Sequence, residues 1–149
     1  MDDSHDLQRF LDAQGGGSYD AALGELRAGR KRGHWIWYVL PQLRGLGASP
    51  TSQRYGIAGL GEARAYLAHP VLGERLRECA AVLAGLPGDD PVEVLGSVDA
   101  LKVRSSMTLF SRAAPGEPVF REVLERFYGG TEDPLTLRAL GLRPPASPR

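Results

Sequence analysis

Apolar residues recur every three or four positions along most of this chain, the spacing that places side chains on one face of an α-helix. Residues 7–11 carry such a face, and it ends at three consecutive glycines. Ser4 or Asp3 is suited to cap this first helix, and Ser18 is suited to cap a second. The pattern therefore predicts a helical hairpin, with Gly29 in the left-handed conformation after the second helix.

The same periodicity returns after a glycine-rich stretch and continues toward the end of the chain. Proline or serine stands at several expected helix starts. Proline suits the first turn because an amide N–H there has no partner within the helix, and a serine side chain can cap the helix. Among these, Ser97 is the expected cap of the longest helix. The expected helices cover residues 60–67, 70–83, 91–95, 97–112 and 120–127, with a short last helix from Pro134.

Two stretches are harder to assign from the pattern alone. Residues 34–40 combine β-branched and aromatic side chains, which favour a strand. A helix that ends before Pro41 fits the same run, and we favour the helix. Residues 45–56 are rich in glycine, serine and proline, a composition that predicts a loop.

Together these elements predict a mainly α fold, a compact single-domain bundle of about six to eight helices with irregular loops. The length agrees, because 149 residues with 42% hydrophobic and 24% charged side chains suit one globular domain. We assign residues 1–142 to this helical domain. Residues 143–149 contain three prolines, and we expect them to form a disordered tail.

The single cysteine, Cys79, excludes an intramolecular disulfide and any thiolate-rich metal site. It falls on an apolar helix face, so we interpret it as a packing residue. No stretch resembles an export signal or reaches the roughly 18 apolar residues that a membrane span needs. We therefore expect a cytoplasmic protein without a membrane partner.

The net charge of zero conceals an uneven distribution. Between residues 26 and 61, hereafter the basic segment, there is no aspartate or glutamate, but there are six arginines and lysines. Both tryptophans, Trp35 and Trp37, lie in the same segment. Cations can bind a phosphate and aromatic rings can stack on a base or sugar, so this segment is the first candidate for a binding site. Any carboxylate that acts beside it must come from another part of the chain.

Familiar cofactor and metal motifs are missing from the sequence. The stretch from Gly24 to Lys31 imitates a phosphate-binding loop, but it has Arg30 in place of the required lysine and no preceding strand. The three histidines are too scattered for a helical metal pair. We therefore expect neither a metal nor a cofactor.

A second group of polar residues lies on the longest expected helix. Asp99, Lys102 and Ser106 stand at positions i, i+3 and i+7, opposite an apolar stripe. Ser105 and Thr108 add hydroxyl groups beside them. The simpler interpretation is a solvent-facing side with an Asp99–Lys102 pair worth about 0.2–0.5 kcal/mol.

Several motifs resemble those of a known bacterial family. They are Gly29-Arg30-Lys31, His34-Trp35-x-Trp37-Tyr38, Pro41-Gln42-Leu43, Ser52-x-x-Tyr55 and Lys102-x-x-Ser105-Ser106-Met107-Thr108. In the stretch from Leu7 to Leu140 the chain is similar to the domain-of-unknown-function 1810 (DUF1810) family, sometimes labelled calpastatin-like, whose members are single, mostly helical domains. One departure is Gly33, where the family usually has a serine that can cap a helix. The resemblance implies no reaction.

The layout also resembles, more distantly, the NADAR family of helical domains, which act on N-glycosidic bonds of ADP-ribose-type compounds. That resemblance implies cations for phosphates, an indole that stacks on a ring, and a carboxylate that stabilises oxocarbenium-like charge or activates water. Asp99 is the first candidate for the carboxylate and Glu25 the second. The candidate ligand contacts are Arg30, Lys31, His34, Trp35, Trp37, Tyr38, Gln42, Tyr55, Lys102, Ser105, Ser106 and Thr108.

Our leading hypothesis is a protein that binds a phosphorylated, nucleotide-like small molecule, with metal-independent cleavage of an N-glycosidic bond as the reaction it would catalyse. The alternative is a nucleic-acid or protein interaction module without catalysis, although a net charge of zero is unusual for a dedicated nucleic-acid binder. A scaffold without a ligand remains open if the tryptophans are core residues. The leading hypothesis requires the basic segment and the face around Lys102 to meet in one hollow.

Overall fold

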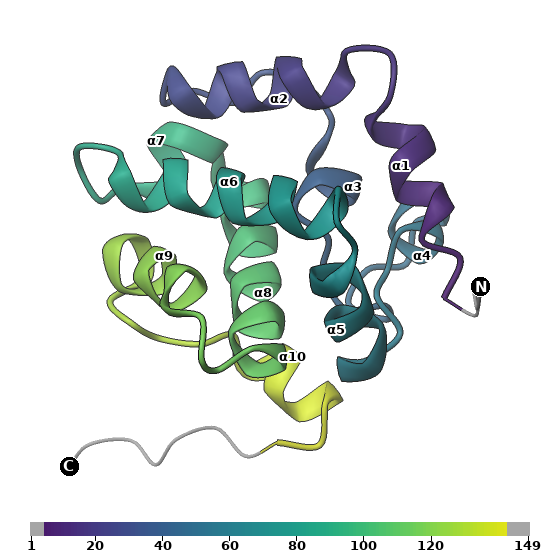
Figure 1. Ribbon diagram of the computed structural model, residues 1–149. Helices are drawn as coiled ribbons and strands as arrows, with labels where there is room; N and C mark the ends of the chain where they lie inside the picture. The colour runs from purple at the N-terminus through teal and green to yellow at the C-terminus, as the bar shows by residue number, and fades with distance from the viewer. Residues whose placement is uncertain (1–4, 143–149) are drawn as a thin grey trace, which may run out of the picture.

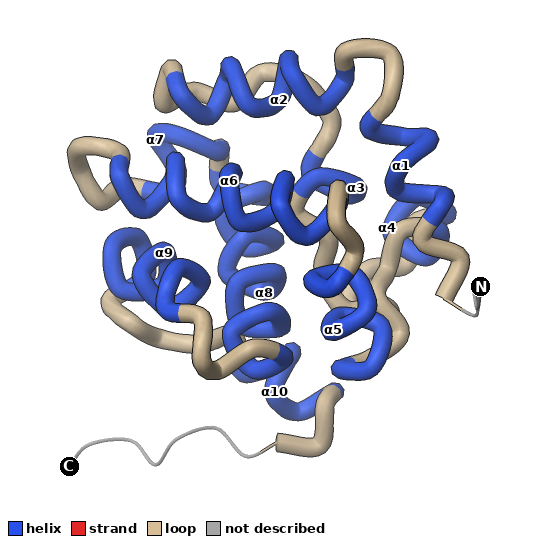
Figure 2. The backbone as a smooth tube through the Cα atoms, in the orientation of Figure 1, coloured by secondary structure: helices blue, strands red, loops and turns tan. Residues whose placement is uncertain are grey.

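The computed structural model describes residues 5–142, so the expected tail at residues 143–149 lies outside the described range. All regular elements in this range are helices (Figure 1), which confirms the mainly α fold. No strand is drawn for the described residues (Figure 2), and extended pairing among them is limited to one parallel bridge between Leu43 and Ile57. The ten helices of the described range are α1 (Gln8–Gln14), α2 (Ser18–Arg27), α3 (Ile36–Val39), α4 (Pro50–Arg54), α5 (Leu60–Ala68), α6 (Leu72–Gly85), α7 (Pro91–Leu95), α8 (Ser97–Ala113), α9 (Pro118–Tyr128) and α10 (Pro134–Ala139).

The central helix of the fold is α8, which contacts α3, α5, α7, α9 and α10 (Figure 1). From Val103 onward it is enclosed on most sides, and Met107 and Phe110 are completely buried. A helix buried in this way is fixed by apolar packing. The first two turns differ, because Val98 and Leu101 are exposed there. The buried half of α8 therefore anchors the helix, and the exposed half is available for a site.

The helix α9 shows why the hydrophobic pattern is a reliable guide in this chain. Phe120, Val123, Leu124 and Phe127 form one buried face against α6 and α8. The helix ends where Gly129 adopts a positive φ of 61°, a conformation that favours glycine. Periodicity and a glycine stop together specify this element.

Two helix starts differ from expectation. The N-cap positions of α2 and α8 are occupied by Gly17 and Gly96, and Ser18 and Ser97 are the first helical residues instead. Neither N-cap makes a side-chain hydrogen bond. The cap expected at residues 3 and 4 lies outside the described range.

The two ambiguous stretches are resolved by the structure. Residues 34–40 contain α3, as favoured, but residues 45–56 contain α4 and are not entirely a loop. The side chain of Ser49 accepts a hydrogen bond from the amide of Ser52 at 3.1 Å, and Pro50 stands in the first turn, so this short helix has both a cap and a suitable start. Single-turn helices of this kind explain why there are more helices than the sequence pattern predicts.

Candidate functional site

The basic segment and the polar face of α8 meet at Asp99. One oxygen of its carboxylate lies 2.6 Å from Nζ of Lys31, and the other lies 3.3 Å from Nζ of Lys102. The Lys31 side chain is 5% exposed, whereas that of Lys102 is 21% exposed. We call Lys31, Asp99 and Lys102 the lysine cluster. Its carboxylate reaches the basic segment from a distant part of the chain, as the sequence requires.

Each lysine of the cluster also faces an indole ring. Nζ of Lys31 lies 4.9 Å from the ring centroid of Trp35, and Nζ of Lys102 lies 3.9 Å from that of Trp37. Both distances allow a cation–π attraction. Trp35 is a buried core residue, but Trp37 is only partly buried. Of the two lysine–indole pairs, a ligand can therefore reach the one formed by Lys102 and Trp37.

Glu25 anchors the loop that carries Lys31. Its Oε1 accepts hydrogen bonds from the amides of Arg32 and Gly33, at 2.6 and 2.8 Å, and from the indole N–H of Trp35 at 2.9 Å. Burial raises the pKa of the Glu25 carboxyl, but these three donors and the charge of Lys31 outweigh it, so the pKa lies below its usual value. Glu25 is therefore an ionised structural anchor.

The lowered pKa of Glu25 makes its contribution to stability dependent on pH. A carboxyl whose pKa is lowered by folding stabilises the protein above its unfolded pKa, and this contribution is lost as pH falls through the folded pKa. We expect the advantage of the wild type over Glu25→Gln, measured as the urea midpoint, to shrink as pH falls from about 7 to about 3. A difference that stays constant over this range would contradict the assigned role.

The departure at Gly33 has a local explanation. A Cβ atom at this position would lie 2.9 Å from Cδ1 of Trp35 and 3.4 Å from Oε2 of Glu25. The N-cap position of α3 is Trp35, so residue 33 does not cap this helix, and the Gly33 amide donates to Glu25 instead.

A groove lies beside the Lys102–Trp37 pair, where the chain after α3 faces α8 and α10. Its volume is about 320 Å³. Three side chains at the groove, Val98, Leu101 and Leu135, are 63%, 67% and 57% exposed, and such gathered apolar groups mark binding surfaces. The residues that line this Trp37–Lys102 groove are Trp37, Gln42, Leu46, Gly47, Val98, Leu101, Lys102, Ser105, Asp133 and Leu135.

The hydroxyl groups of α8 have mainly structural partners. Ser105 lines the groove, but its Oγ lies 2.7 Å from Oγ1 of Thr136 in a buried hydrogen bond. Thr108 is fully buried, donates to the carbonyl of Arg104 and accepts from the amide of Asp133 at 2.9 Å. Thr108 thus positions the start of α10 and one wall of the groove. Ser106 is also fully buried and does not line the groove.

The remaining predicted contacts lie elsewhere among the described residues. Arg30 and His34 are exposed and do not line the groove. Tyr38 and Tyr55 pack edge to face, with ring centroids 5.5 Å apart, and the Tyr38 hydroxyl lies 3.0 Å from Oγ of Ser18. Of the predicted ligand contacts, the structure brings together Trp37, Gln42, Lys102 and Ser105 at the groove.

The sequence reasoning missed the apolar wall of the groove and Asp133. One signal was available for part of it. Val98 and Leu101 lie on α8 outside the apolar stripe that enters the core, and unpartnered apolar residues on a polar face indicate a binding surface. Leu46 and Leu135 come from distant segments and carry no such signal.

Comparison with known proteins assigns the family. The family described as "Protein of unknown function (DUF1810)" matches residues 4–140. The chain belongs to the DUF1810 family. A crystal structure of the conserved hypothetical protein Rv1873 from Mycobacterium tuberculosis is similar to it, with 50% sequence identity and a TM-score of 0.91 over 94% of this chain and 99% of that one. No curated protein matches this DUF1810 chain.

Neither match names a reaction or a ligand. They do not support the more distant resemblance to NADAR domains, which stays a prediction.

Across residues 5–142, no group of three His, Cys, Asp or Glu side chains is placed to hold a metal ion. Burial raises the pKa of the Cys79 thiol to about 12, so this cysteine is a packing residue. No helix of the described range combines the length and apolar composition of a membrane span.

Proposed function

We propose that this DUF1810 protein binds a phosphorylated, nucleotide-like small molecule in the Trp37–Lys102 groove. The observation that carries the proposal is a partly exposed lysine at the edge of an apolar-walled hollow. Leu46, Leu101 and Leu135 provide apolar surface for a base, and Lys102 provides a cation for a phosphate.

The charges of the lysine cluster favour an anion at Lys102. Two lysines share one carboxylate, so the cluster carries one formal positive charge in excess. Asp133 is the carboxylate among the residues that line the groove, and it accepts hydrogen bonds from the amide and the hydroxyl of Thr136. Lys31 is nearly buried and makes the shorter contact with Asp99, and it also donates a hydrogen bond to the carbonyl of Gly33. Lys102 makes the longer contact and reaches solvent. A phosphate can therefore pair with Lys102 while Lys31 continues to hold Asp99.

Trp37 contributes in a way that depends on Lys102. The ammonium group covers one face of the indole at 3.9 Å from its centroid. A phosphate that draws the ammonium away from the ring uncovers this face for a planar group. The Lys102 side chain would then make stacking on Trp37 depend on the charge of the ligand.

The two candidate carboxylates are not placed for hydrolysis of a ligand in the groove. Asp99 is held by two lysines and Glu25 by three hydrogen-bond donors, and neither lines the groove. A general acid needs a raised pKa, whereas the pKa of Glu25 is lowered. Asp99 holds the two lysines in place, and Glu25 holds the loop before α3.

Titration calorimetry with AMP, ADP-ribose and adenosine tests the proposal. We expect AMP and ADP-ribose to bind the wild type, and Lys102→Gln to weaken both by about tenfold or more, because a charge-assisted contact worth about 1.5–3 kcal/mol is lost. Arg121→Gln, an exposed cation on α9 away from the groove lining, is the matched control and should bind as the wild type does. Unchanged affinity in Lys102→Gln would contradict the proposal, as would adenosine binding as tightly as AMP.

A surface for a protein partner is the second candidate, and the exposure of Val98, Leu101 and Leu135 favours it. It replaces the first candidate if neither phosphorylated compound binds and if Leu101→Ser alters self-association of the chain in sedimentation equilibrium.

A further inference from the structure

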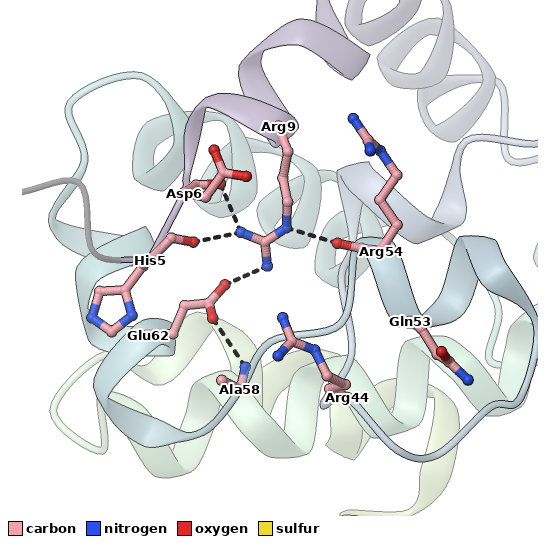
Figure 3. A pocket seen from close by; sticks show the side chains of 8 residues that line it. All are labelled: His5, Asp6, Arg9, Arg44, Gln53, Arg54, Ala58 and Glu62. Atoms are coloured by element: carbon pink, nitrogen blue, oxygen red, sulfur yellow. Dashed lines mark hydrogen bonds and ion pairs between the residues drawn. The ribbon is translucent and has the colours of Figure 1, made fainter.

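A second hollow, of about 460 Å³, opens where the chain before α1 meets the end of α4 and the start of α5 (Figure 3). It shares no lining residue with the Trp37–Lys102 groove. Polar and charged side chains dominate its lining, which consists of His5, Asp6, Arg9, Arg44, Gln53, Arg54, Ala58 and Glu62. We call it the arginine hollow.

The floor of the arginine hollow is a buried guanidinium group. Arg9 is 7% exposed, and all five of its N–H donors have partners. The partners are the carbonyls of His5, Asp6, Arg54 and Gly56 and the carboxylate of Glu62. Arg9 is therefore saturated and does not bind a ligand itself.

Glu62 is equally committed. Its Oε2 lies 2.6 Å from Nη2 of Arg9, and its Oε1 accepts from the amide of Ala58 at 3.1 Å (Figure 3). The two buried charges balance each other, so the floor is neutral and fixed. A ligand in the hollow meets a rigid base and is recognised by the side chains above it.

Arg54 lies over the ring of Tyr55, with Cζ 5.6 Å from the ring centroid, so the cation of the arginine hollow without a side-chain partner in residues 5–142 is Arg44. It is exposed, and it makes no ion pair with any carboxylate in residues 5–142. Its guanidinium points into the hollow toward Arg9, whereas that of Arg54 points away from Arg44 at the rim (Figure 3). The backbone of Arg44 is held in place, because its amide donates to the carbonyl of Ile57 at 2.7 Å.

The chain packs so closely against the backbone of Arg44 that residue 56 has no room for a side chain. A Cβ atom on Gly56 would lie 2.6 Å from Cα of Arg44 and 2.9 Å from the carbonyl oxygen of Ser52. The chain segments around residues 44 and 56 are therefore in close contact, and the parallel bridge between Leu43 and Ile57 joins the same two segments. The backbone of Arg44 is therefore already ordered, so that binding has to order the side chain alone.

We propose that the arginine hollow binds the phosphate group of a small phosphomonoester, with Arg44 as the principal contact. The planar fork of a guanidinium matches two oxygens of a phosphate. Three arginines line the hollow against two carboxylates, which leaves one formal positive charge in excess. The Arg54 guanidinium and the Gln53 side chain lie at the rim and point away from Arg44 (Figure 3), so Arg44 is the donor that meets the phosphate. This site is independent of the Trp37–Lys102 groove.

The test follows side-chain and backbone amides by NMR during a titration with inorganic phosphate at constant ionic strength. In the wild type we expect the signals of the Gln53 side chain and the Ala58 amide to shift and saturate. Arg44→Gln should weaken this binding about tenfold, the loss expected for one charge-assisted contact. Arg44 has no side-chain partner in the described range, so this variant should keep the fold, and unchanged far-ultraviolet circular dichroism checks that it does.

Two controls separate the possible outcomes. Lys102→Gln should bind phosphate at the arginine hollow as the wild type does, so failure of the nucleotide groove would leave this result intact. Arg121→Gln should also have no effect. Phosphate binding that is unchanged in Arg44→Gln, or absent from the wild type, would overturn the proposal. So would tighter, steeply salt-dependent binding of an oligothymidylate at the same signals, because it would assign the hollow to a nucleic-acid backbone.

Discussion

Arg9→Ala should destabilise the protein by about 3–5 kcal/mol, the cost of breaking a buried ion pair from one side. Glu62, which is 3% exposed, would keep a buried carboxylate without its cation. Four backbone carbonyls would also lose the donor that joins the chain before α1 to the end of α4 and the start of α5. Urea unfolding at neutral pH measures the effect as a lower midpoint.

Two variants separate charge from hydrogen bonding at this position. Arg9→Lys keeps the charge but supplies three donors in place of five, so its stability should fall between those of the wild type and Arg9→Ala. Glu62→Gln in the Arg9→Ala background should recover part of the loss, because it removes the unpaired charge. A loss of stability in Arg9→Ala no larger than that of an exposed arginine, such as Arg121→Ala, would contradict this account.

Asp99→Asn should destabilise the protein by about 3 kcal/mol, the lower end of the range for a broken buried pair, since Asp99 retains some exposure. The nearly buried ammonium of Lys31 would exchange its carboxylate partner for a neutral amide oxygen, beside the Gly33 carbonyl and the ring of Trp35. Neutral hydrogen-bond acceptors compensate a buried cation poorly. Chemical unfolding of the variant at neutral pH gives the size of the loss.

The matched control for Asp99→Asn is the double variant with Lys31→Met. Methionine fills the space of the lysine stem without a charge, so the double variant should be more stable than Asp99→Asn alone. If the double variant is less stable by the sum of the two single losses, Lys31 and Asp99 act independently and the lysine cluster is not a unit.

The helices could be predicted where buried apolar residues recur every three or four positions in the sequence. Phe120 and Phe127 stand on one face of α9, and Gly129 stops it, so local sequence is sufficient. The short helix α4 was missed because its five residues are too few to show a period. Its cap at Ser49 and its start at Pro50 are the local signals that remained.

The candidate site could be predicted only in part. The lack of acids in the basic segment implied a carboxylate from elsewhere, and the structure supplies Asp99. Which of two similar lysines is buried could not be deduced, because the exposure of Lys31 and Lys102 depends on how the loop before α3 packs on α8. The buried ion pair and hydrogen bonds of Arg9 could not be predicted either, because its partners lie in segments that only folding brings together.

The indole N–H signals of the two tryptophans test the central claim most directly. The chain has two such groups, one in the core and one at the groove. Titration with AMP should shift the signal of Trp37 in proportion to occupancy and leave that of Trp35, which donates to Glu25 at 2.9 Å, nearly unchanged. A ligand-induced shift confined to Trp35, or saturation of AMP binding without any change at Trp37, would contradict the assignment of the Trp37–Lys102 groove as the ligand site.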